Sequence, residues 1–203
     1  MEVRIDDQAY LSEVAGNNLQ DIIGDLITNA LGNERAISEV KINGEPYQIA
    51  TMGPAEELPR ERIQSLEVET IPSSEVALHF LENGGEYLKA IRASVEQVAE
   101  LFRVSDEQQA SEHYLQTLES LQLFMHVLQS SRETLGLDFD RAQLEGVSAE
   151  AGLVRLGELI KELLGAQEQE DWVLLADILQ YDLTAELDNW QRLMPVLRQQ
   201  ALS

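Results

Sequence analysis

The spacing of the apolar residues changes near residue 73, and this change constrains the fold more than any other feature of the sequence. Before residue 73, short alternating runs are separated by turn residues, whereas after it apolar residues recur every few positions. Alternation is typical of half-buried strands, and a period of about 3.6 is typical of amphipathic helices. We therefore predict two domains, a small α/β module at 1–72 and a helical bundle at 73–203.

Two long helices are predicted first in the helical region. The first carries apolar residues at helical spacing, namely Val76, Phe80, Tyr87, Ile91, Val95, Val98 and Phe102. Gly84-Gly85 either kinks this helix or divides it. Ser105 and Gln108 form a capping-box pattern that begins the second helix. Its apolar seam should be buried along a neighbouring helix, and the seam consists of Tyr114, Leu118, Leu121, Met125 and Leu128.

Two more helices follow a connector at 136–146 that is expected to pack over the bundle. Ser148 caps the third helix, which ends at Gly165, and the fourth begins near Glu170. Pro195 is expected to stop or kink the fourth helix, because proline lacks the N–H that an interior turn needs. Short connectors imply antiparallel neighbours. The predicted fold class is α+β, mainly helical, with an antiparallel three- or four-helix bundle after the N-terminal module.

The N-terminal module begins with a weak hairpin and a helix. Val3 and Ile5 alternate with charged residues, and residues 9–11 can return as a second short strand. Asn17 is predicted as the N-cap of a helix that Gly32 closes, since asparagine accepts from exposed helical N–H groups and glycine adopts positive φ. The order so far is strand, possible strand and helix.

A second hairpin and a final strand complete the predicted module. Asn43-Gly44 lies between apolar strands, and this dipeptide favours a type I′ turn because both turn residues need positive φ. Residues 51–62 contain glycine and proline and are predicted as a loop. Residues 63–71 form the last strand, which Pro72 stops.

This order of elements resembles a β-grasp module, and Lys41-Ile42-Asn43-Gly44-Glu45 is similar to the Val-Asn-Gly-Glu turn of ubiquitin-like sulfur carriers. The resemblance covers about a third of the chain and implies the fold alone. Sulfur carriers act through a terminal Gly-Gly, whereas Gly84-Gly85 is internal and the chain ends in Ala201-Leu202-Ser203. Carrier chemistry is therefore not transferred to this protein.

The charge of the chain constrains its partners. It holds 37 acidic and 14 basic side chains, a formal charge of -23, and both parts share the excess. Nucleic acids and anionic bilayers bind proteins through lysine and arginine, so neither is an expected partner. A basic protein is electrostatically favoured, although solubility also explains an acidic surface. The charged N-terminus and the lack of a long apolar run predict a cytoplasmic protein.

No combination of residues in the sequence specifies a reaction. The chain has no cysteine, which excludes disulfides and thiolate metal sites. His79, His113 and His126 are far apart, and none belongs to the Glu-x-x-His pairs of metal-binding bundles. Glu75 and Glu82 flank His79 at positions -4 and +3, so one metal-binding face is conceivable there, although such spacing is expected by coincidence in a glutamate-rich chain. Nucleophile elbows and phosphate-binding glycine loops are also missing, so we predict no catalytic, cofactor or metal residues.

The most distinctive stretch runs from Asp171 to Leu183 and continues to Trp190. One interpretation places Trp172, Leu175, Leu179 and Leu183 in the core. The other is that Trp172, Tyr181 and Trp190 line a partner groove, because tryptophan and tyrosine dominate binding hot spots. The stretch, with residues 37–45 and 66–70, resembles an uncharacterised family of acidic bacterial proteins with a small N-terminal module and a helical C-terminal part. That resemblance implies a bacterial origin and no activity.

Three functions remain open at this level. The leading hypothesis is a cytoplasmic adaptor, regulatory subunit or export-chaperone-like protein that binds a protein partner through its helical region. The first alternative is a small-molecule or metal-dependent enzyme with a pocket between module and bundle, and the second is a structural homo-oligomer. A homodimer is expected, because the third and fourth helices carry more apolar residues than one buried stripe requires.

Overall fold

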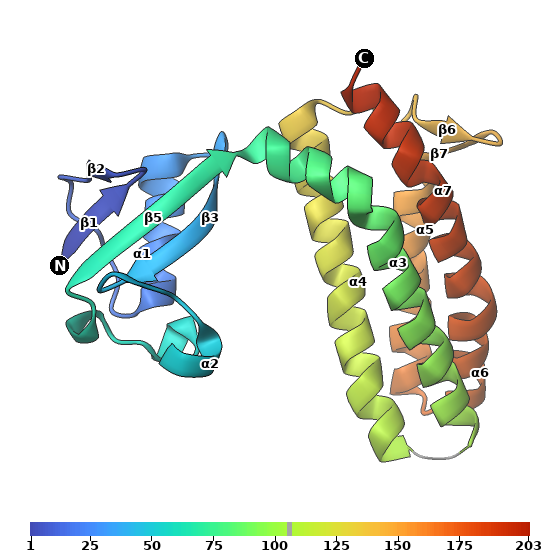
Figure 1. Cartoon of the computed structure of the whole chain (residues 1–203). Coiled ribbons are helices and arrows are strands. Elements are labelled where there is room, and N and C mark those ends of the chain that lie inside the picture. Colours follow the sequence, from blue (N-terminus) through green and yellow to red (C-terminus); the bar gives the residue numbers. More distant parts are fainter. Residues whose placement is uncertain (105–106) are drawn as a thin grey trace. The chain divides into compact units, whose positions relative to one another are not determined.

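The computed structural model of the protein describes residues 1–104 and 107–203, apart from the side chains of residues 107 and 108. It divides into two compact units, Met1–Val76 and Ala77–Ser203, each with its own hydrophobic core (Figure 1). The fold is α+β and mainly helical, as predicted. The predicted capping box of Ser105 and Gln108 lies outside the described residues and side chains.

The N-terminal unit is a five-stranded mixed sheet with the strand order β2-β1-β5-β3-β4, in which β1 and β5 are parallel. Its elements, in chain order, are β1 (Glu2–Ile5), β2 (Gln8–Ala9), α1 (Leu19–Leu26), the π-helical η1 (Ile27–Leu31), β3 (Arg35–Ile42), β4 (Glu45–Pro46), α2 (Ile49–Met52), the 3-10 turns η2 (Ala55–Glu57) and η3 (Arg60–Arg62), and β5 (Ser65–Pro72). The chain order of strand, strand, helix, hairpin and strand is the β-grasp-like order expected from the sequence.

Local residue choices explain the turns of this unit. Asn43 and Gly44 have φ of 54° and 85°, which confirms the predicted positive-φ turn. The N-cap of α1 is Asn18, one residue later than the predicted Asn17, and its Oδ1 accepts from the Asp21 N–H at 2.8 Å. The predicted loop at 51–62 contains the end of α2 and two 3-10 turns. Leu58 and Ile63, in and just after this segment, are buried in the core, which holds it against the sheet unit.

A hydrogen-bond network fastens the β1–β2 turn to the sheet. Asp6 accepts from the backbone N–H of Thr70 at 2.8 Å, from the Thr70 hydroxyl at 2.7 Å and from Arg35 Nη2 at 3.2 Å. These bonds favour the ionised carboxylate, and the two from Thr70 have the largest effect in lowering the pKa of Asp6. One side chain thus connects the turn to both β5 and β3.

The C-terminal unit is a bundle in which α3, α4, α5 and α7 run alongside one another (Figure 1). Its elements are α3 (Ser73–Arg103), α4 (Glu107–Leu135), a hairpin of β6 (Gln143–Leu144) and β7 (Val147–Ser148), α5 (Ala149–Glu168), α6 (Trp172–Asp177), the π-helical η4 (Ile178–Leu183), and α7 (Thr184–Ala201). Leu137 and Phe139 are buried, so the connector packs over the bundle as expected. Ser148 caps α5, as predicted, by accepting from the Ala151 N–H at 3.2 Å.

Of the two outcomes expected at each helix-breaking site, only a kink remains, because neither helix is divided or stopped there. Helix α3 runs unbroken through Gly84-Gly85, and α7 continues past Pro195 to Ala201. Packing explains Gly84, because a Cβ there would lie 2.2 Å from Met194 Cε of α7. Gly85 has no such constraint, since its nearest neighbour would be Gln191 Cγ at 3.8 Å. A tertiary contact therefore accounts for Gly84 in the interior of a helix, despite the poor helix propensity of glycine.

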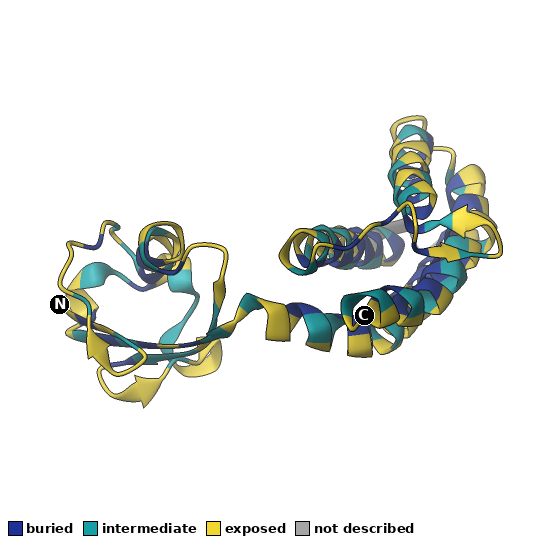
Figure 2. Cartoon of the chain, turned by 90° about the horizontal axis from the view of Figure 1, so that it is seen from above, coloured by how far each residue is buried: buried dark blue, intermediate teal, exposed yellow. Residues whose placement is uncertain are grey.

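The core of the bundle is formed by the inner faces of its helices, which Figure 2 shows in dark blue. The predicted α4 seam is confirmed at Tyr114, Leu118, Leu121 and Leu128, whereas Met125 is half-buried. Phe124 was not predicted as part of this seam, yet the Phe124 ring is fully buried. It contacts Phe80, Tyr87 and Trp190 with centroid distances of 5.7 to 6.4 Å.

Replacing Leu121 with alanine tests the predicted seam. Leu121 is fully buried, so Leu121→Ala should lower the free energy of unfolding by about 2–5 kcal/mol through lost burial and the cavity left behind. Leu123 lies on the same helix with 55% of its surface exposed, and Leu123→Ala is the matched control. Urea denaturation of both variants makes the comparison. Equal losses of unfolding free energy in the two variants would show that Leu121 is not a core residue.

The Asp6 network predicts a pH dependence of the N-terminal unit. A carboxylate whose folded pKa is lowered adds stability above its unfolded pKa and loses it as the pH falls through the folded value. Asp6→Asn should therefore lower the urea midpoint at pH 7, and the difference from wild type should shrink below about pH 4. NMR signals of residues 1–76 would report the midpoint. Asp7→Asn, next in the same turn, is the control, and a pH-independent difference would contradict the assignment.

Candidate functional site

Three exposed apolar side chains of the C-terminal unit lie on α6 and η4. Asp171 caps α6 by accepting from the Leu174 N–H at 3.0 Å, after a turn in which Glu170 has a φ of 54°. The inner face of the helix buries Leu175, Leu179 and Leu183, as one interpretation of the sequence predicted. The outer face leaves Val173 74%, Leu174 46% and Tyr181 63% exposed. We call Trp172, Val173, Leu174 and Tyr181 the α6 surface.

Trp172 is half-buried at the edge of this surface. Its indole stacks on Phe102 of α3 with a centroid distance of 5.2 Å and an interplanar angle of 9°. An aromatic stack of this geometry fixes the position of the ring without covering it completely. Trp172 is thus a partly accessible aromatic side chain next to the exposed Val173.

Tyr181 is held by charged neighbours. Arg103, the last residue of α3, binds Asp177 Oδ1 through Nη2 at 2.9 Å, and its guanidinium carbon lies 5.8 Å from the Tyr181 ring centroid. The hydrogen bond to Asp177 is the main cause that raises the pKa of Arg103. Arg103 was not predicted as part of this surface, because nothing in the sequence indicates that the end of α3 meets α6.

Trp190 does not belong to this surface. It is fully buried, with its ring centroid 6.0 Å from that of Phe124 and 6.5 Å from that of Phe139. A Cβ at Gly152 of α5 would lie 3.3 Å from the Trp190 ring, so the two helices approach closely there. The predicted groove of Trp172, Tyr181 and Trp190 is therefore corrected: Trp190 is a core residue, and the exposed partners of Trp172 are Val173 and Leu174.

A partly buried carboxylate lies beside the Trp190 indole. Glu186 Oε1 would be 3.1 Å from a Cβ at Gly152, and Asn189 Nδ2 donates to Glu186 Oε2 at 3.4 Å. Burial is the main cause that raises the pKa of Glu186, and the hydrogen bond from Asn189 opposes it. Its neighbours are Gly152, Asn189 and Trp190, and none of these belongs to the α6 surface.

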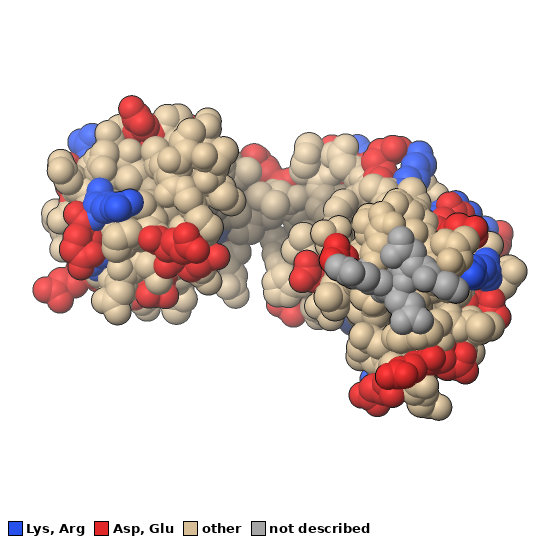
Figure 3. Space-filling model, turned by 90° about the horizontal axis from the view of Figure 1, so that it is seen from below, with Lys and Arg blue, Asp and Glu red and all other residues tan. Residues whose placement is uncertain are grey.

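Acidic side chains surround the α6 surface. Glu168, Glu170, Asp171, Asp177 and Asp182 are all exposed on or next to α6 and η4. Figure 3 views the end of the helical unit at which α6 begins and shows acidic side chains at its margin. The exposed apolar residues are therefore bordered by negative charge.

The basic residues of the chain offer little positive surface, because most are already paired with a carboxylate. Those in salt bridges are Arg4, Arg35, Lys41, Lys89, Arg92, Arg103, Arg132, Arg141, Arg155, Arg192 and Arg198. With 37 acidic residues against 14 basic ones, a large excess of carboxylates stays without such a partner. The surface potential that a partner meets is negative.

The open face of the N-terminal sheet contrasts with the α6 surface. Lys41 Nζ binds Glu69 at 2.6 Å and Glu39 at 3.4 Å across β3 and β5, and the hydrogen bond to Glu69 raises the pKa of Lys41. Arg4 and Glu2 pair along β1 at 3.7 Å. This face is charged and internally paired, so it lacks the apolar anchors that binding hot spots require.

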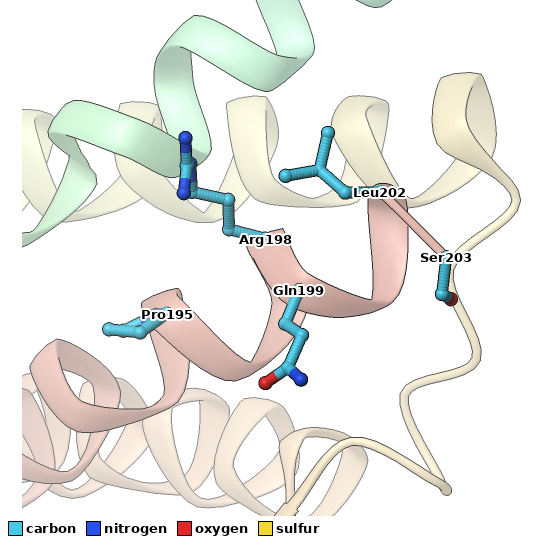
Figure 4. Close-up of a pocket in the computed structure, with 5 residues that line it drawn as sticks. All are labelled: Pro195, Arg198, Gln199, Leu202 and Ser203. Atoms are coloured by element: carbon cyan, nitrogen blue, oxygen red, sulfur yellow. The ribbon is translucent and has the colours of Figure 1, made fainter.

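One hollow lies between α3 and α7, and a second adjoins it along the C-terminal end of α7. One has a volume of about 410 Å³ and is lined by Leu81, Glu82, Gly85, Gln191, Met194, Pro195 and Arg198. The other, of about 530 Å³, shares Pro195 and Arg198 and extends to Gln199, Leu202 and Ser203 (Figure 4). Arg198 points toward α3 in this view and binds Glu82 Oε1 through Nε at 3.1 Å. The sequence analysis did not place a site here.

The described residues form no metal site and no membrane span. Within residues 1–104 and 107–203, no group of three or more histidine, aspartate or glutamate side chains could hold a metal ion. His79 has Asn83 as its ring neighbour at 3.4 Å, and the flanking Glu82 binds Arg198 instead. In the same part of the chain, no helix is long and apolar enough to cross a bilayer.

Comparison with known proteins gives family matches for both parts of the chain. Residues 79–193, more than half of the chain, match the family model described as Domain of unknown function (DUF8042). Residues 2–71 match the model described as Domain of unknown function (DUF8043). No curated protein and no solved structure matched the chain. Neither description names an activity, so the geometry of the surfaces carries the functional argument.

Proposed function

Because the chain belongs to a family whose description, Domain of unknown function (DUF8042), names no activity, we propose a function from the geometry of the α6 surface. The protein is a non-catalytic interaction module. It binds a protein partner through Trp172, Val173, Leu174 and Tyr181. The proposal covers an adaptor, a regulatory subunit or an export-chaperone-like protein of the bacterial cytoplasm. Nucleic acids and membranes are not its partners.

The observation that carries this proposal is the exposure of Val173, Leu174 and Tyr181 beside the half-buried Trp172. Burying such side chains releases about 25 cal/mol per Å² of apolar surface, and aromatic residues contribute most in interface centres. The surrounding carboxylates select the partner, because complementary charge speeds association and excludes acidic proteins. The partner that fits is a basic segment with apolar anchors, such as an amphipathic helix.

Tryptophan fluorescence tests this proposal directly. The chain has two tryptophans, and the buried Trp190 should not respond to a surface ligand, so Trp172 reports binding at the α6 surface. Titration with a tryptophan-free amphipathic peptide of leucine and lysine should change the fluorescence emission of Trp172 until the binding site is saturated. Added salt should weaken the binding of the peptide. Val173→Asp should abolish the response, because it places a charge among the apolar anchors.

Matched controls make the peptide test specific. Val154 on α5 is 55% exposed, and Val154→Asp should leave the binding of the peptide unchanged. A leucine–glutamate peptide of the same pattern should not bind. Equal binding of the leucine–lysine peptide to wild type and Val173→Asp would show that general charge attraction, and not the α6 surface, holds the peptide.

A structural homo-oligomer is the second candidate, and the same exposed side chains favour it. The connector covers part of the apolar surplus through Leu137 and Phe139, but Leu164 stays 44% exposed on α5 along with the α6 surface. A second copy could cover these residues, since twofold pairing is the commonest form of soluble oligomer. The enzyme alternative stays a prediction without a site to support it.

Sedimentation equilibrium separates the two candidates. If the α6 surface pairs with itself, the wild type should reach a dimer mass at micromolar concentrations, and salt should strengthen the dimer by screening the charge of -23 on each chain. Val173→Asp should then return the protein to a monomer, whereas Val154→Asp should not. A wild-type monomer at both low and physiological salt would reject the homodimer and leave the surface to another protein.

A further inference from the structure

Two residues that disfavour helices lie in the interiors of different helices and line the same hollow. Gly85 belongs to α3 and Pro195 to α7, and both border the 410 Å³ pocket. An interior glycine costs about 1 kcal/mol relative to alanine, and an interior proline about 3 kcal/mol. Such local violations are expected at functional sites, where they are retained for a reason other than stability.

The packing of the bundle does not account for either residue. A Cβ on Gly85 would meet Gln191 Cγ at an ordinary 3.8 Å, in contrast to neighbouring Gly84, where Met194 Cε leaves no room. Pro195 is exposed, so its ring is not needed to fill the core. Both residues shape the pocket: Gly85 leaves it open, and Pro195 supplies part of its wall.

The same two residues bring hydrogen-bond acceptors to the pocket. Because proline has no N–H, the carbonyl of Gln191, four residues earlier, lacks its usual helical donor. The Gly85 carbonyl is open enough on the side of α7 to accept from Gln191 Nε2 at 3.3 Å. Arg198 directs both Nε and Nη2 to Glu82 Oε1, and Glu82 Oε2 has no partner among the described residues.

The floor and charge of the pocket complete its chemistry. Leu81 and Met194 are almost fully buried and form an apolar floor beneath these acceptors. A volume of 410 Å³ lies within the range of small-ligand sites, which combine an apolar lining with a few placed polar groups. Arg198 also lines the pocket, but two of its N–H groups are held by Glu82, and the net charge of -23 favours a cationic donor over an anion.

We propose that this pocket between α3 and α7 binds a small organic amine in its ammonium form. The ammonium group donates to Glu82 Oε2 and to the Gln191 carbonyl, and the alkyl chain lies on Leu81, Met194 and Pro195. The ammonium has three donors and no acceptor, so it can donate to both of these acceptors. This site is separate from the α6 surface, so it stands or fails independently of the proposed interaction function.

The test uses n-butylammonium as the probe and the full chain. Titration followed by ¹H–¹⁵N NMR should give saturable shifts at the amides of Gly85 and Gln191. The uncharged 1-butanol and the anionic butyrate should bind at least about tenfold more weakly, the factor expected for losing one hydrogen bond to a charged group. Equal affinities for the three probes, or no saturable shift at these amides, would overturn the proposal.

Three variants and one control assign the binding to this pocket. Gly85→Leu fills the pocket, and Pro195→Ala gives the Gln191 carbonyl its helical donor. Glu82→Gln removes the negative charge of the carboxylate. Each variant should weaken n-butylammonium binding at least about tenfold. Gly157→Leu is the control, because Gly157 is a helical glycine of α5 with open space around it. It should leave the affinity unchanged.

The melting temperature distinguishes a ligand site from a structural role. Pro195→Ala and Gly85→Ala should both raise it, since each replaces a poor helix former where alanine fits. Higher stability together with weaker amine binding supports the proposal. A lower melting temperature in both variants would show that Gly85 and Pro195 stabilise the fold. The inference that they are retained for ligand binding would then be wrong.

Discussion

The burial of Trp190 is the interaction on which the arrangement of the helical unit depends. Its indole contacts Phe124 of α4 and Phe139 of the connector, and the missing side chain of Gly152 lets α5 approach it. An indole buries about 150–250 Å² of surface and dominates the energy of the core that contains it. Because α7 presents this ring to three other segments, its position determines how they pack and which face of the preceding α6 is left outside.

The helical phase between Trp172 and Trp190 explains why the sequence predicted the elements but not the site. About five turns of an ideal α-helix separate the two residues, so an unbroken α-helix would place both on one face. The π-helical η4, from Ile178 to Leu183, changes this phase. Trp190 enters the core while Trp172 stays at the surface. Apolar periodicity predicts that a helix exists, but it does not reveal a π-helical segment.

The same limit applies to the glycines and the proline. Their types predicted that α3 is kinked or divided and that α7 is stopped or kinked, because local preference is all that a single sequence displays at these positions. The contact of Gly84 with Met194 joins residues far apart in the chain, and only the folded unit brings them together. By contrast, the Asn43-Gly44 turn and the Ser148 cap depend on neighbours within three residues. Those features were predicted correctly because their causes are local.

The distribution of charge differs between the two units. On the sheet face of the N-terminal unit, Lys41 bridges Glu39 and Glu69, so carboxylates and cations satisfy each other there. Beside the α6 surface, Arg103 binds Asp177. Glu168 and Glu170, just before α6, are exposed. In a binding surface, apolar contacts provide most of the affinity, and unpaired charges determine which partners bind. Recognition of a partner needs both on one surface. The helical unit combines them on α6, whereas the sheet face has already paired its charges.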